Sequence, residues 1–151
     1  MLVQILEAGY ERVFTVVDYY DGPREGVANY DKRPHHYKSE WDEDADDWAE
    51  FYILTPVSDE YFAAALESWE IWLRYERALH SGDARREDHP ALPEDQNRHS
   101  ELKAILESQV LPNPDGSTRM CADFLPIESS PEKSQVGMRP LQVRWRPPHA
   151  V

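Results

Sequence analysis

The stretch from Ser58 to Gly82 carries the start, the periodicity and the stop of one long amphipathic helix. Ser58 is a favoured N-cap residue, and Asp59 and Glu60 follow it in the first turn, where acidic side chains suit the helix dipole. Basic residues near His80 and the glycine at position 82 suit the other end. The apolar residues recur at intervals of three and four: Phe62, Ala65, Leu66, Trp69, Trp72 and Leu73. We therefore predict a helix over about residues 59–80.

Segments rich in β-branched and aromatic residues lie on both sides of this helix and predict strands. Four of them precede the helix, at residues 13–20, 27–30, 35–38 and 51–57. Two follow it, at residues 117–124 and 141–145. Turn residues separate the first three strands, which predicts an antiparallel meander. A second, shorter helix is predicted over about residues 94–109, and its narrow apolar stripe is expected to cover the core from outside.

These elements predict an α+β fold in a single domain of residues 1–151. We expect a twisted antiparallel sheet or a half-open small barrel with the long helix packed on it. Residues 81–92 and 128–137 are polar and are expected to be loops. A chain of 151 residues is long enough to bury a substantial core.

The net charge of −13 narrows the choice of partners. Such a surface repels phosphate backbones, so we expect no nucleic-acid binding, and it attracts basic protein surfaces. No apolar run approaches the roughly 20 residues of a membrane span. Cys121 is the only cysteine, which excludes an internal disulfide and favours a reducing compartment. We predict a cytoplasmic protein with no cofactor and no membrane association.

The segment from Ser39 to Phe51 is the strongest functional signal in the chain. It surrounds two tryptophans, Trp41 and Trp48, with acids and contains no Lys or Arg. The expected structure is a solvated loop or short helix whose tryptophans are anchored in the core. Five carboxylates are the candidate residues for docking a basic partner: Asp42, Glu43, Asp44, Asp46 and Asp47. Alternatively, these acids pair internally with Arg144 and Arg146 of the last strand, or they bind a cation.

A calcium loop is the specific form of that last alternative. Asp42, Asp44 and Asp46 match the first three ligand positions of an EF-hand loop. However, Asp47 stands where the loop requires glycine, and Ile53 stands where it requires a bidentate glutamate. The segment therefore does not match a recognised metal loop.

Four histidines are weak candidates for metal ligands. His35 and His36 are adjacent in a predicted strand, so their side chains point to opposite faces and cannot chelate one ion. His89 and His99 could join Asp residues near the second helix, but the spacings of known zinc motifs are absent. We therefore favour no metal site.

One resemblance to other proteins rests on the segment DYYDGPREGVANY at residues 18–30, continuing through Pro34 and His35. It extends to residues 69–73 and 89–93. The chain resembles a group of small bacterial proteins of unassigned function. The resemblance implies a bacterial source and brings no activity or catalytic residue with it.

The sequence lacks the nucleophile and phosphate-binding motifs of common hydrolases and nucleotide-binding proteins. The leading hypothesis is a protein-interaction domain that binds another macromolecule through its acidic face. The alternative is a small metal-dependent enzyme or metal-binding protein that uses His35 or His36 with carboxylates near the turn from Asp18 to Asp21. A structural subunit of an oligomer is a third hypothesis, and the oligomeric state is left open.

Overall fold

The computed structural model describes residues 6–127 and 140–148, and within them the chain forms six strands and two α-helices. The predicted α+β class is confirmed. The chain divides into two compact units. The first contains residues 1–57, 111–130 and 140–151, and the second contains residues 58–110 and 131–139. The single domain stays a prediction, because the units are defined by their contacts and not by how they unfold.

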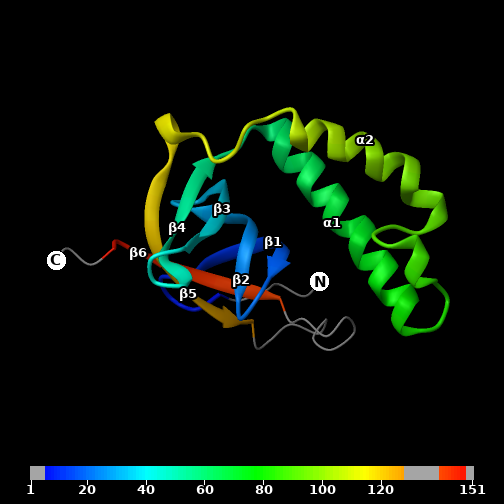
Figure 1. Cartoon of the computed structure of the whole chain (residues 1–151), viewed down its shortest axis with the longest axis horizontal. Coiled ribbons are helices and arrows are strands. Elements are labelled where there is room, and N and C mark those ends of the chain that lie inside the picture. The colour runs from blue at the N-terminus through cyan, green and yellow to red at the C-terminus, as the bar shows by residue number, and fades with distance from the viewer. Residues whose placement is uncertain (1–5, 128–139, 149–151) are drawn as a thin grey trace. The chain divides into compact units, whose positions relative to one another are not determined.

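The first unit is a closed barrel of antiparallel strands in the order β1-β2-β3-β4-β5-β6. The strands are β1 (Glu11–Tyr19), β2 (Pro23–Tyr30), β3 (Arg33–Asp42), β4 (Asp47–Pro56), β5 (Thr118–Pro126) and β6 (Leu141–Arg146). Figure 1 shows the chain leaving the barrel after β4, forming both helices and returning as β5.

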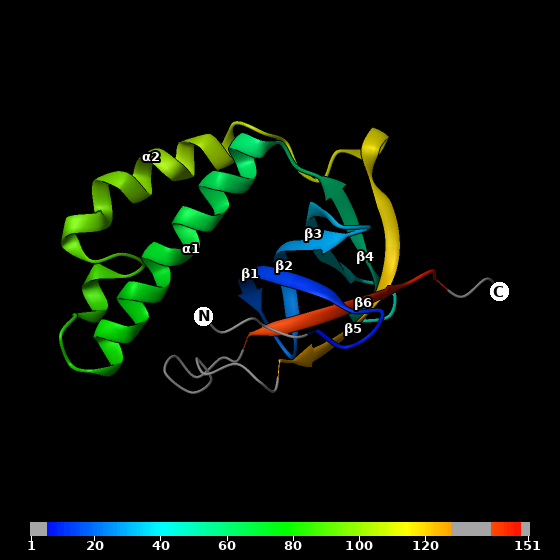
Figure 2. The same ribbon diagram turned by 180° about the vertical axis from the view of Figure 1, so that it is seen from behind.

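Closure of the barrel corrects the expected twisted sheet or half-open barrel. β1 pairs with β6 through two register pairs, Glu11 with Val143 and Arg12 with Gln142. Figure 2 shows these two strands side by side. The paired residues of β1 and β6 lie 130 or more residues apart along the chain, so no local pattern of the sequence could indicate that the sheet closes.

The barrel interior is packed with aromatic rings. Tyr37, Leu54 and Val143 are fully buried there. The rings of Tyr37, Tyr52, Phe124 and Trp145 contact one another in every pairing, with centroid separations from 5.7 to 6.2 Å. Tilted and edge-on rings at these separations are favourable arrangements for aromatic pairs. The interior is therefore a core made of rings that fix one another.

The polar atoms of these rings have backbone partners. The Tyr37 hydroxyl donates to the carbonyl of Thr15 at 2.8 Å, and the Trp145 indole donates to the carbonyl of Asn29 at 2.8 Å. The Tyr52 hydroxyl donates to the carbonyl of Pro23 at 2.6 Å. These bonds satisfy groups that would be costly to bury unpaired.

Gly26 on β2 allows two strands and a ring to approach closely. A Cβ atom at this position would overlap the backbone carbonyl of Thr15 and lie 2.7 Å from the Tyr37 hydroxyl. Backbone atoms of a paired strand cannot move aside. Only glycine therefore fits at position 26, beside the hydrogen bond from the Tyr37 hydroxyl to the Thr15 carbonyl.

The second unit is a pair of helices, α1 (Asp59–His80) and α2 (Gln96–Glu107). The predicted helix 59–80 is confirmed, and the Ser58 hydroxyl accepts a hydrogen bond from the amide of Tyr61 as its cap. The 3-10 helix η2 (Pro93–Asp95) leads into α2. Leu102 of α2 is fully buried in one cluster with Ala64 and Ile71 of α1.

The apolar stripe of α2 therefore forms part of a helical core, which corrects the expectation that it only covers a core from outside. Two ion pairs connect α1 to the second helical segment: Arg98 of α2 with Glu67, and Asp95 of η2 with Arg74. The connection at residues 81–92 contains the short 3-10 helix η1 (Arg86–Asp88). The predicted loop at 128–137 lies outside the described residues. Neither described helix is long and apolar enough to cross a membrane.

Candidate functional site

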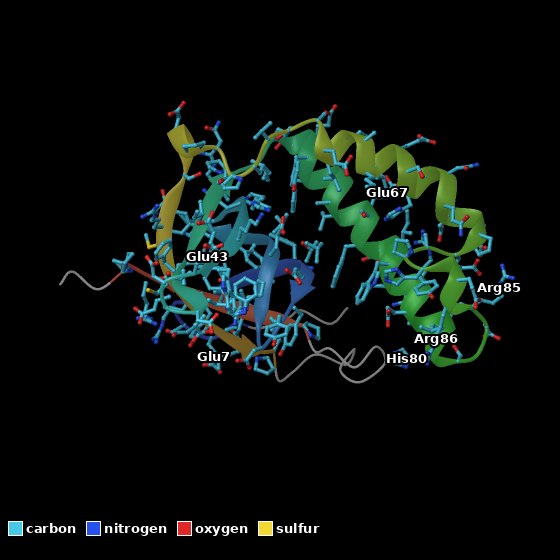
Figure 3. All side chains as sticks on the ribbon, viewed as in Figure 1. Glu7, Glu43, Glu67, His80, Arg85 and Arg86 are labelled. Atoms are coloured by element: carbon cyan, nitrogen blue, oxygen red, sulfur yellow. The ribbon has the colours of Figure 1, made fainter. Side chains whose placement is uncertain are left out.

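The acidic segment forms the tip of the β3–β4 hairpin. Trp41 pairs with Trp48 across the two strands, and Asp42 pairs with Asp47 one position further out. Asp46 adopts a positive φ of 52°, a left-handed conformation that aspartate tolerates better than most residues. We call residues 42–47 the acidic turn, and Figure 3 labels Glu43 within it. Its five candidate carboxylates are all exposed: Asp42, Glu43, Asp44, Asp46 and Asp47.

Backbone hydrogen bonds order the acidic turn. The Oδ1 atom of Asp42 accepts from the amides of Asp44 at 3.0 Å and Ala45 at 3.3 Å. The Oδ1 atom of Asp47 accepts from the amide of Trp48 at 2.8 Å. Two of the carboxylates are therefore held by the turn itself. The expected solvated loop or short helix is a hairpin turn, and its carboxylates are exposed as expected.

No basic side chain of the described residues forms an ion pair with the acidic turn. Pairing with Arg144 and Arg146 was one of the alternatives for the acidic segment, and both arginines instead donate to Asp123 at 2.8 Å. The β5–β6 register places Asp123 directly opposite Arg144, which brings the Asp123 carboxylate within hydrogen-bonding distance of these arginines. Hydrogen bonds from the two guanidinium groups lower the pKa of Asp123. The acidic turn is left without an internal counter-charge from these strands.

The two tryptophans are not anchored in the core, which corrects that expectation. The β2–β3 pairing ends at Lys38 and the β4–β5 pairing ends at Tyr52, so the hairpin beyond them has only two strands. A two-stranded projection has no barrel interior in which to bury its side chains. Trp41 is consequently 48 % exposed, and Trp48 is half-buried.

Trp48 is the centre of a small group that we call the tryptophan cluster: Tyr20, Arg24, Trp41 and Trp48. The Trp41 and Trp48 rings meet edge to face, with centroids 5.4 Å apart and an interplanar angle of 85°. The Tyr20 ring, from the turn after β1, lies 6.3 Å from the Trp48 ring. Tyr20 is 67 % exposed. The β1–β2 turn and the β3–β4 hairpin therefore meet at this end of the barrel.

Arg24 completes the cluster by stacking on Trp48. Its guanidinium carbon lies 4.6 Å from the centroid of the Trp48 ring. Its Nε donates to the carbonyl of Tyr20 at 2.7 Å and its Nη2 to the carbonyl of Asp21 at 3.0 Å. The sequence analysis did not single out Arg24 or Tyr20. Their only signal was an aromatic pair beside turn residues, which does not by itself indicate contact with a distant hairpin.

Exposed apolar side chains continue along β1 towards Tyr20. Val17 is 66 % exposed and Tyr19 is 58 % exposed. Single apolar residues on a surface need no explanation, but a succession of large ones indicates an interaction surface. Val17, Tyr19, Tyr20 and Trp41 are four of the six large apolar side chains that are exposed within the described residues.

The two strand histidines have separate surroundings, as their alternation predicted. The Nδ1 atom of His35 lies 2.8 Å from the carbonyl of Arg33. The Nε2 atom of His36 lies 2.8 Å from Oε2 of Glu25. The hydrogen bond from His36 is the main reason that the pKa of Glu25 is lowered. The buried Nδ1 atom of His36 has no hydrogen-bond partner among the described residues.

His36 meets Glu25 rather than Asp18 or Asp21, and the sequence analysis did not select that glutamate. The two-residue turn at Asp31 and Lys32, with positive φ at both positions, sets the β2–β3 register. That register puts His36 opposite Val27, two residues from Glu25 and on the same face of the sheet. The length of this turn was therefore the sequence signal that places His36 beside Glu25.

The other two histidines belong to the helical unit. His89 is exposed, and its ring packs edge-on against Tyr75 at 5.5 Å. His99 is half-buried on α2. Within residues 6–127 and 140–148, no three His, Cys, Asp or Glu side chains lie close enough together to hold a metal ion.

Comparison with protein-family models, with curated proteins and with solved structures gives no match for this chain. The acidic turn and the tryptophan cluster are therefore the features from which we infer a function.

Proposed function

We propose that this protein binds a basic partner protein through the acidic turn and the tryptophan cluster. The observation that carries the proposal is the union of two features at one end of the barrel. Exposed aromatic rings supply apolar contact area, and the acidic turn that follows them in the hairpin supplies carboxylates that form no ion pair with the described basic residues. Tryptophan, tyrosine and arginine are the residue types that dominate binding energy at protein interfaces.

The charge of the whole chain supports this proposal. A net charge of −13 attracts a basic partner over several ångströms and accelerates encounter. The same charge opposes binding to phosphate backbones. The turn also places Asp42 and Asp47 directly opposite each other, and such like-charged neighbours repel. A cationic group from the partner would relieve that repulsion, so the local electrostatics favour binding of a basic partner.

A quantitative capture experiment with matched variants tests this function. The site variant replaces Asp42, Asp44, Asp46 and Asp47 with Asn, which removes four charges and keeps the oxygen atoms that accept backbone hydrogen bonds. The control variant also removes four exposed negative charges, all from the helical unit: Glu70→Gln, Asp83→Asn, Glu87→Gln and Glu94→Gln. Both variants therefore change the net charge equally.

We expect the wild type and the control variant to retain the same basic proteins from a lysate of the source organism, and the site variant to lose them. Retention of an identical set by the site variant would contradict the proposed function. Loss by both variants in equal measure would contradict it as well, because it would show that net charge alone governs binding.

A further inference from the structure

We propose that the bond between Asp21 and Gly22, in the turn between β1 and β2, is a site of spontaneous isomerisation that converts Asp21 to isoaspartate. This inference goes beyond the proposed function, because it concerns covalent chemistry of the chain itself. Three observations carry it: an exposed Asp–Gly bond, a glycine amide with no hydrogen bond, and an arginine that contacts the carbonyl group changed by the reaction.

The reaction uses only the chain and water. The backbone nitrogen of Gly22 attacks the Cγ atom of the protonated Asp21 side chain, a C–N bond forms, and the carboxyl hydroxyl leaves with the amide proton as water. Water then adds to the main-chain carbonyl carbon of the five-membered imide and breaks its bond to the Gly22 nitrogen. The main chain now runs through the former side chain, and the former main-chain carbonyl has become a carboxylate. One water molecule leaves and one is consumed, so mass and charge are unchanged.

Two Asp–Gly bonds occur in the sequence, at positions 21–22 and 115–116. Glycine favours the attack at both, because it carries no side chain that hinders the approach of its nitrogen. Asp21 and Asp115 are both exposed. Composition and exposure therefore do not distinguish the two bonds, and the difference lies in what the glycine amides contact.

The Gly22 amide is free to react. The amide of Tyr20 donates to the Gly22 carbonyl at 3.0 Å, and the Nη2 atom of Arg24 donates to the Asp21 carbonyl at 3.0 Å. Both bonds use carbonyl groups of the turn, and the Gly22 amide itself has no hydrogen-bond partner among the described residues. A Cβ atom at position 22 would meet nothing within 4 Å, so this part of the turn has room to rearrange.

The Gly116 amide is occupied. It belongs to the 3-10 helix η3 (Pro114–Gly116) and donates to the carbonyl of Asn113 at 3.2 Å. The Asp115 amide donates to Oδ1 of Asn113 at 3.0 Å. Attack at this bond must first break the hydrogen bond of the Gly116 amide, and the net contribution of one hydrogen bond corresponds to about a two- to tenfold lower rate. Asp115 is therefore an internal control for Asp21.

Arg24 favours the product at position 21. Its Nη2 atom lies 3.0 Å from the Asp21 carbonyl oxygen, and that carbonyl becomes the new carboxylate. The carboxylate of unmodified Asp21 forms no ion pair with the basic residues that the structure describes. Isomerisation therefore moves the negative charge next to a guanidinium, where a charge-assisted hydrogen bond replaces a weaker one to a neutral carbonyl.

Prolonged incubation of the folded protein at neutral pH and physiological temperature tests this inference. The same incubation in guanidinium chloride gives the rate at each bond in the unfolded chain. Trypsin releases residues 13–24 and 104–119, which places the two Asp–Gly bonds on different peptides. Electron-transfer mass spectrometry then distinguishes isoaspartate from aspartate at each position. The variants are Asp21→Glu, whose longer side chain cannot form the five-membered ring, and its matched control Asp115→Glu.

We expect isoaspartate to accumulate at position 21 about two- to tenfold faster than at position 115 in the folded wild type, after each rate is divided by its rate in the unfolded chain. Asp115→Glu should keep the rate at position 21. Asp21→Glu should lose the isoaspartate of the peptide 13–24, which also contains Asp18.

Three results would overturn the inference: equal or reversed normalised rates at the two positions, isoaspartate that forms only in the unfolded chain, or isoaspartate that persists in the peptide 13–24 of Asp21→Glu. None of them affects the capture of a basic partner by the acidic turn. Failure of this inference therefore leaves the proposed function standing, and failure of the capture experiment leaves this inference standing.

Discussion

The cross-strand pair of Asp42 and Asp47 makes a prediction about stability that can be worked out from the structure. The two residues are register partners at the exposed end of the hairpin, and both are acidic. Replacing either one with Asn removes the repulsion and keeps the Oδ1 atom that accepts backbone hydrogen bonds. We therefore expect Asp42→Asn and Asp47→Asn each to stabilise the free protein, although both weaken binding of a basic partner.

The size of the effect follows from the spacing of paired residues. Side chains of directly opposed residues begin about 5 Å apart, and two unit charges at that distance in water repel by about 0.8 kcal/mol. Screening at 0.15 M salt, where the Debye length is about 8 Å, reduces this to about 0.4 kcal/mol. At 1 M salt the Debye length is about 3 Å, and the repulsion falls below about 0.2 kcal/mol.

Urea unfolding of the two single variants and the double variant, each at 0.15 M and 1 M salt, measures this energy as a double-mutant cycle. The gain of the double variant should be smaller than the sum of the single gains, because either substitution alone ends the pair. Single variants that lose stability at both salt concentrations would refute the reasoning, and so would gains that do not shrink with added salt. Asp42→Ala is the control for the hydrogen bonds and should lose about 1 kcal/mol.

Three further predictions concern the two units and the partly buried hydrogen bond between His36 and Glu25. Gly26→Ala should destabilise the protein by about 2 kcal/mol or more in urea unfolding, because its Cβ overlaps a paired backbone, whereas Gly116→Ala, which meets nothing within 4 Å, should be nearly neutral. Leu102→Ala should lower the free energy of unfolding by about 2–5 kcal/mol. If the protein is a single cooperative domain, this variant and Gly26→Ala should shift the same single unfolding transition, and two separate transitions would contradict that expectation. The pKa of Glu25 is lower in the folded protein than in the unfolded chain, where it is about 4.3, so ionised Glu25 stabilises the fold above that pH and loses this effect as the pH falls through the folded pKa. The stability advantage of the wild type over Glu25→Gln should therefore be full at pH 7 and fade below about pH 4. An unchanged difference at pH 3 would show that the hydrogen bond from His36 is not its source.

The parts of the fold that sequence patterns predicted are those fixed by near neighbours. The helix at residues 59–80 follows from a cap at Ser58 and a period visible within one segment, and the structure reproduces both ends. Each predicted strand also overlaps one of the six observed strands, although β3 and β4 continue into the acidic segment that was predicted as a loop or short helix. Such signals are local, since each depends on residues a few positions apart.

The parts that escaped prediction depend on pairing between distant segments. Arg144 and Arg146 bind Asp123 because of the β5–β6 register, which no local pattern specifies. Trp41 is exposed because the strands on either side of the hairpin end before they reach it. The acidic residues of the candidate site were identified correctly as an exposed group, but the aromatic half of the site required knowledge of which turns meet.

The pairing of β1 with β6 has a consequence for how the barrel forms on the ribosome. The strand that closes the ring begins at Leu141, so β1 must wait with one edge unpaired while the intervening helices are synthesised. At about 5–20 residues per second, the wait from the end of β1 to the end of β6 is on the order of 10 seconds. A nascent chain with an open, partly apolar edge is vulnerable to pairing with other chains for that whole interval. The acidic turn is complete early in synthesis, and its charge would discourage such encounters before the barrel closes.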